Sequence, residues 1–158
     1  MSRKSTATKR NYLEKWKWKI QTVDSEGTAG AENSIALDSA GNPHITYDRG
    51  SNSSLKFAEW TGSSWSIQTV DSVGMFGGGC SLALDSAGNP HISYHKNVNN
   101  QGTTNSYMKF AEWTGSEWNI QTVESEGPIV FGSSLALDSA GKPHISYSGG
   151  DLRYAFGS

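Results

Sequence analysis

The stretch Ser81–Tyr94 reads SLALDSAGNPHISY, and it decides the fold because the chain contains it three times. Two short apolar or β-branched runs flank a segment rich in Asp, Gly, Asn and Pro, which is typical of two strands joined by a turn. The units recur about every 50 residues, so the chain repeats one structural design. The other copies are SIALDSAGNPHITY at Ser34–Tyr47 and SLALDSAGKPHISY at Ser134–Tyr147.

A second block follows the first two copies: LKFAEWTGSSWSIQTV at Leu55–Val70 and MKFAEWTGSEWNIQTV at Met108–Val123. It predicts two further strands joined by a short hairpin loop. Four short strands per unit, with no sustained helical periodicity, predict an all-β chain, and specifically a β-propeller with three four-stranded blades. The predicted blades span residues 34–70, 81–123 and 134–158.

The third unit lacks a match to the fourth strand, and WKIQTV at Trp18–Val23 matches the strands that end at Val70 and Val123. We therefore predict that residues 16–23 form a closing strand for the third blade. A six-bladed ring then needs two chains, and a two-fold homodimer is favoured over an open filament. The residues expected at this closure are Trp16, Trp18, Ile20, Val23, Leu152, Tyr154 and Phe156.

Charge is distributed unevenly along the 158 residues. Residues 1–20 hold seven of the 13 Lys and Arg residues and one of the 15 acids. We expect residues 1–15 to be a basic flexible leader, without the apolar run of a secretory signal. The acidic body argues against a nucleic-acid partner. No apolar run is long enough for a membrane span.

Several repeated side chains favour structural roles over chemistry. The histidines occur once per blade, too far apart to share a metal ion, so we expect them to bond neighbouring backbone and predict no metal and no cofactor. Each turn aspartate is expected to cap its own turn. The tryptophans of each complete unit are expected to pair across their hairpin, with sugar stacking as the alternative. The side chains are His44, His91, His144, Asp38, Asp85, Asp138, Trp60, Trp65, Trp113 and Trp118.

The single cysteine, Cys80, excludes a disulfide within the chain. A catalytic cysteine needs a base and a lowered pKa. Nothing in the sequence places the unrepeated His95 beside Cys80, so we interpret Cys80 as a small core or loop residue and predict that the protein is not an enzyme.

The two repeated blocks resemble blades of β-propeller proteins found on microbial cell surfaces and, more loosely, the Asp-box repeats of sialidase-like propellers. Asp85–His91 keeps the Asp and Gly but lacks the Asp-box spacing and Trp. The sialidase catalytic set, which includes three arginines, has no match, because residues 21–158 hold only Arg49 and Arg153. The resemblance implies a propeller fold and an extracellular or cell-surface location, and leaves function open because propellers host enzymes, lectins and scaffolds.

The loops between blades and within the middle hairpins vary, while the other turns are nearly constant. Because alternate turns of a meander lie at opposite ends, the variable loops share one face, where a rigid scaffold carries binding. We predict a lectin-like module for a carbohydrate or a protein partner, with a structural, self-assembling protein as the alternative. Residues 95–106 are interpreted as the longest loop. The candidate ligand-binding residues are Arg49, Phe76, His95, Asn97, Asn99, Gln101 and Phe131.

Overall fold

The computed structural model describes residues 16–50, 54–72, 79–125 and 131–158. The described residues form three antiparallel sheets and no α-helix. The first sheet contains β1 (Ala29–Leu37), β2 (Pro43–Arg49), β3 (Ser54–Trp60) and β4 (Trp65–Ser72). The second contains β5 (Ser81–Leu84), β6 (Pro90–Asn100), β7 (Thr103–Trp113) and β8 (Trp118–Ser125). The third contains β9 (Phe131–Leu137), β10 (Pro143–Ser148) and β11 (Leu152–Phe156).

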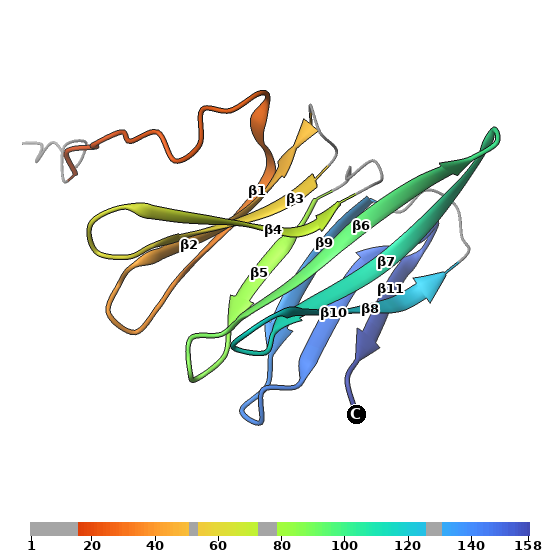
Figure 1. Ribbon diagram of the computed structural model, residues 1–158. Coiled ribbons are helices and arrows are strands. Elements are labelled where there is room, and N and C mark those ends of the chain that lie inside the picture. The colour runs from red at the N-terminus through yellow and green to blue at the C-terminus, as the bar shows by residue number, and fades with distance from the viewer. Residues whose placement is uncertain (1–15, 51–53, 73–78, 126–130) are drawn as a thin grey trace, which may run out of the picture.

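Each sheet is a meander, and the first strands of the three sheets lie beside one another in the order β1, β5, β9 (Figure 1). Hydroxyl groups tie these inner strands together. The Leu82 amide donates to Ser34 Oγ at 3.1 Å, and one unit later the Leu135 amide donates to Ser81 Oγ at 3.0 Å. The expectation of an all-β chain with successive antiparallel sheets is confirmed. Closure of the sheets into a six-bladed ring stays a prediction.

The turn between the first two strands of each unit is capped by its aspartate, as the sequence predicts. Asp38 Oδ1 accepts the amides of Ala40 at 2.9 Å and Asn42 at 2.8 Å. The Asn42 side chain adds a bond to the same carboxylate and is the largest cause of the lowered pKa of Asp38. Gly41 has a φ of 84°, which favours glycine at that point of the turn. The turns at Asp85 and Asp138 repeat the amide bonds.

The tryptophan pairs lie across their hairpins, so the predicted pairing is confirmed. Trp60 and Trp65 have ring centroids 5.5 Å apart, and those of Trp113 and Trp118 are 5.4 Å apart. Trp118 also reaches the neighbouring sheet, where its ring meets Phe57 edge-on at 5.5 Å. Trp118 therefore contributes to packing between sheets as well as within its own hairpin.

The apolar core lies between sheets. The cluster between the first and second sheets consists of Leu55, Phe57, Val70, Leu82, Ile92, Tyr94 and Ala111. The cluster between the second and third sheets consists of Met108, Phe110, Leu135, Ile145 and Tyr147. Each sheet thus buries one face against the next, which is how a meander with one apolar face is stabilised.

One sequence-based interpretation was wrong: residues 95–106 are not a loop. β6 and β7 remain paired out to Asn100 and Thr103, which leaves Gln101 and Gly102 as the turn. Both turn residues have positive φ, 51° and 90°, as a two-residue hairpin requires. The asparagines suggested a loop, but the β-branched residues among them continue the strands.

The segment that was expected to close a blade has no strand partner among the described residues. Residues 16–28 are not in a strand, and the Trp18 and Ile20 side chains are 88% and 99% exposed. At the other side of the molecule, β11 is an edge strand on which Leu152 is 87% exposed (Figure 1). Trp16, Tyr154 and Phe156 are also exposed, and Val23 is half-buried. In the described part of the chain, no helix has the length and apolar character to cross a membrane.

Candidate functional site

A tyrosine and an acid meet at each junction between units. The Tyr94 hydroxyl donates to Asp71 Oδ2 at 2.9 Å, joining β6 to the end of β4. Tyr147 donates to Glu124 in the same way at 2.8 Å, and Tyr47 donates to Asp24 Oδ2 at 2.8 Å. Burial, together with the facing carboxylate, raises the pKa of each tyrosine, so the hydroxyl stays a donor.

The Tyr47 pair is informative because Asp24 follows Trp18–Val23, the segment with the fourth-strand sequence. Asp24 therefore occupies the position at which a preceding sheet ends, although the described chain holds no such sheet. These pairs were not predicted from the sequence. The available signal was an acid after every Gln-Thr-Val and a tyrosine 23 residues later.

A cation completes each junction. Arg49 Nη2 lies 2.7 Å from Glu26 Oε2, and Lys96 Nζ lies 2.8 Å from Asp71 Oδ1. Arg153 pairs with Glu124 at the last junction. Arg49, a predicted ligand-binding residue, thus joins β2 to the segment that precedes β1.

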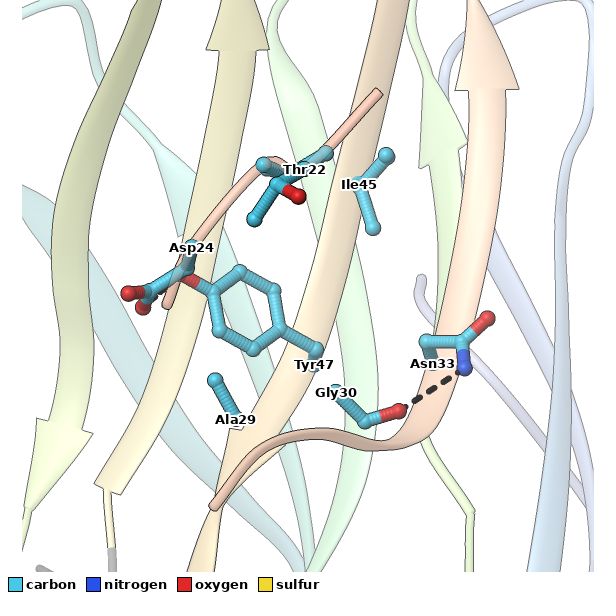
Figure 2. A pocket seen from close by; sticks show the side chains of 8 residues that line it. Thr22, Asp24, Ala29, Gly30, Asn33, Ile45 and Tyr47 are labelled. Carbon is cyan, nitrogen blue, oxygen red and sulfur yellow. Dashed lines mark hydrogen bonds between the residues drawn. The ribbon is translucent and has the colours of Figure 1, made fainter. Parts of the chain in front are cut away.

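Two cavities flank the unfinished ends of the sheet array. The first, of about 270 Å³, lies between residues 22–24 and β1 and β2. Figure 2 shows Tyr47 and Ile45 of β2 facing Thr22 and Asp24 across it, with the Asn33 side chain bonded to the Gly30 carbonyl at its rim. The second, also about 270 Å³, lies between β8 and the third sheet and is lined by Phe110, Gln121, Thr122, Val123, Pro143, Ile145, Ala155, Phe156 and Gly157.

The structure brings Cys80 and His95 to the lining of one small cavity, which the sequence did not predict. The cavity measures about 10 Å³, room for about one water molecule and none for a substrate. The Cys80 thiol donates to the Glu32 carbonyl at 2.6 Å and lies 3.8 Å from the Thr46 carbonyl, and burial raises the pKa of Cys80 to about 12. A protonated thiol is a poor nucleophile, so this pair is not arranged for catalysis.

Cys80 should react slowly with iodoacetamide in the folded protein. At pH 8 a thiol whose pKa is about 12 carries roughly a thousandfold less thiolate than an ordinary cysteine, so alkylation should slow by a similar factor. Mass spectrometry of timed samples, with the chain in guanidinium chloride as the reference, measures both rates. Equal rates would contradict the buried, protonated thiol.

The predicted ligand residues fall into separate places. His95 is buried at 2% exposure in β6, and Asn97 is half-buried on the same strand. The Asn99 side-chain oxygen accepts the Gly102 amide at 3.1 Å, and Gln101 is exposed at the tip. Phe131 is the first residue of β9, and Phe76 lies outside the described residues. Asn97, Asn99 and Gln101 therefore share one hairpin, while Arg49 belongs to another sheet.

The repeated histidines lie against carboxylates instead of bonding to backbone, which corrects the expectation for them. His44 Nε2 is 3.7 Å from Asp38 Oδ2, and the buried ring packs on Phe57 with centroids 5.7 Å apart. His91 repeats this arrangement with Asp85 and Phe110. Within the described ranges no group of three His, Cys, Asp or Glu side chains is placed to hold a metal ion.

Comparisons with known proteins find similarity only among solved structures. No family model matches the chain. No curated protein matches it either. Among solved structures it is similar to a fucose lectin from Kordia zhangzhouensis in complex with methyl-fucoside, at 18% identity and a TM-score of 0.49, over 80% of this chain and 97% of that one.

Proposed function

We propose that the protein is a non-catalytic binding module, in which two chains form a six-bladed β-propeller and present a polar hairpin to a carbohydrate. The observation that carries this proposal is the β6–β7 hairpin. Its strands have 11 residues each, whereas the corresponding strands have seven in the first sheet, and six and five in the third. In an otherwise regular repeat, this ribbon projects beyond its neighbours (Figure 1).

The chemistry of the ribbon suits a neutral saccharide. Asn97, Asn99, Gln101, Thr103 and Thr104 bring amide and hydroxyl groups to it, and all but Asn97 are exposed. Amides both donate and accept hydrogen bonds, as sugar hydroxyls do. In a two-chain propeller the ribbon occurs twice, so weak sites gain avidity on a multivalent surface.

A second candidate is a structural, self-assembling propeller without a small ligand. The exposed apolar residues on β11 and on residues 16–20 favour it, because an edge strand left open is a liability unless another chain covers it. The same assembly is compatible with ligand binding, so glycan binding is the property that separates the two candidates.

The test replaces Asn97–Ser106 by a two-residue Asn-Gly turn, which shortens the ribbon to about the length found in the first sheet. We expect the unaltered protein to bind a subset of glycans on an array, and the shortened protein to lose that binding with an unchanged melting temperature. Ser116→Ala, in the β7–β8 loop at the opposite end of the sheet, is the matched control and should bind normally. Retained binding after shortening would contradict the site, and no binding by the unaltered protein would favour the structural candidate.

A further inference from the structure

The contact between the first and second sheets is complete within one chain, and it shows which side chains fill a finished junction between two sheets. Leu55 and Phe57 of β3 insert toward the second sheet, where they pack in one cluster with Ile92 and Tyr94. The Trp118 ring of β8 returns toward the first sheet and meets Phe57 at 5.5 Å. A finished junction therefore needs two side chains from a third strand and one tryptophan from the next sheet's fourth strand.

The junction between the second and third sheets lacks its tryptophan. Phe110 corresponds to Phe57, and it lines the second cavity of about 270 Å³. In the repeat, the fourth-strand tryptophan of the third sheet corresponds to Trp18, which is 88% exposed. Gly157 stands where Trp113 stands in the second sheet, so this position brings no ring to the cavity that it lines.

The first cavity lacks the complementary pair. Its lining residues Val23, Ile45 and Tyr47 correspond to Val70, Ile92 and Tyr94, on which Leu55 and Phe57 pack in the finished junction. The counterparts of Leu55 and Phe57 are Leu152 and Tyr154 on β11, which are 87% and 63% exposed. Each cavity thus corresponds to side chains that lie exposed elsewhere in the same chain.

We infer that a second copy of this chain fills both cavities, with Trp18 of each copy seated against Phe110 of the other and Leu152 and Tyr154 of each copy entering the cavity at Ile45 and Tyr47 of the other. The inference rests on the two-chain propeller of the proposed function. It assigns the seam of that propeller, which is the contact of residues 16–23 of one copy with β11 of the other. The exchange must be between copies, because residues 16–23 and β11 lie on opposite sides of one chain (Figure 1). The Tyr47–Asp24 bond already holds residues 22–24 at the seam position.

The repeat also fixes the register of the exchanged strand. In the first sheet Trp60 pairs with Trp65 and Glu59 with Ser66. The corresponding pairs across the seam are Gly157 with Trp18 and Phe156 with Lys19. Cross-strand Cα atoms in such a pair lie roughly 5.5 Å apart, within the range that a disulfide spans.

Cysteine cross-linking tests this register directly. In a Cys80→Ser background, which copies the serine found at Ser133, the pair Lys19→Cys and Phe156→Cys should cross-link under mild oxidation into a closed two-chain species. The control pair Ile20→Cys and Phe156→Cys points its thiols to opposite faces of the sheet and should not link. A dimer by mass in which neither pair links would overturn the assigned seam while leaving a two-chain assembly and ligand binding intact. A ladder of longer species would show an open filament instead.

Substitution of Trp18 tests the anchor. Trp18→Ala should raise the dissociation constant of the dimer by about a hundredfold or more, as expected for a tryptophan in a fully packed pocket. Trp16→Ala removes the same type of side chain two residues earlier, where the other units have loop serines, and should change the constant by less than about threefold. Analytical ultracentrifugation measures both constants. Equal effects of the two substitutions would overturn the assignment of Trp18 to the Phe110 cavity.

Discussion

Removal of residues 1–23 is expected to abolish the two-chain assembly and to leave a protein that aggregates. The deletion exposes the unpaired N–H and C=O groups of β11 together with Leu152, Tyr154 and Phe156, and an open apolar edge pairs with any available strand. Size-exclusion chromatography and thioflavin fluorescence measure the outcome.

Removal of residues 1–10 is the matched control for this deletion. That segment matches no repeat, so the assembly and the melting temperature should change little. A soluble, folded, monodisperse protein lacking residues 1–23 would contradict the role assigned to the segment.

Phe57→Ala should lower the free energy of unfolding by about 3–5 kcal/mol, because it removes a ring that is 2% exposed between two sheets. Urea denaturation measures this loss. The substitution also leaves the Trp118 ring without its edge-on partner.

The corresponding substitution Phe110→Ala can be compared with Phe57→Ala, because the two phenylalanines occupy the same position in successive units. In a single chain Phe110 is 4% exposed and lines the second cavity, so its ring loses fewer contacts on that side and its substitution should cost less than that of Phe57. If Trp18 of a second copy packs on Phe110, the two substitutions should cost similar amounts above the concentration at which the dimer forms. A Phe110→Ala loss that stays much smaller at all concentrations would contradict the filled cavity.

The repeat pattern was sufficient to predict the strands, the aspartate-capped turns and the tryptophan pairs. These features depend on residues close together in the sequence. Asp38 caps a turn four residues long, and Trp60 and Trp65 flank a single hairpin loop. Local geometry of this kind follows directly from turn chemistry and alternation.

The sequence did not predict the contacts between distant segments, and it did not predict the structure of a segment whose composition was ambiguous. The Tyr94–Asp71 bond joins different sheets, and the cavity of Cys80 and His95 is closed by Glu32, Asp48 and Leu55 of the first sheet. Both features therefore depend on how the sheets pack. The amide-rich composition of residues 95–106 suggested a loop, but in the structure these residues continue β6 and β7 and stay paired up to the two-residue turn. Asparagine is depleted in strands only on average, and pairing can override that preference.

Ring closure gives the binding proposal its geometry. In the proposed ring, two chains related by a two-fold axis place the β6–β7 ribbons symmetrically, so both can engage one multivalent surface. A variant that no longer forms the two-chain assembly, such as Trp18→Ala, should lose apparent affinity for a surface densely covered with glycan. The same variant should keep its affinity for a free monosaccharide. The seam and the ribbon can therefore be altered separately, Trp18→Ala acting on the first and Asn97–Ser106 shortening on the second.

The mass of the protein in solution tests the central claim most directly, because the two cavities of about 270 Å³, the exposed residues 16–20 and the edge strand β11 are all assigned counterparts in a second copy. Multi-angle light scattering should give one species of twice the 17.0 kDa chain mass at all concentrations above the dissociation constant of the dimer, with no further growth. A monodisperse species at the single-chain mass would contradict the exchanged closing strand, and a mass that grows steadily with concentration would replace the closed ring by an open filament.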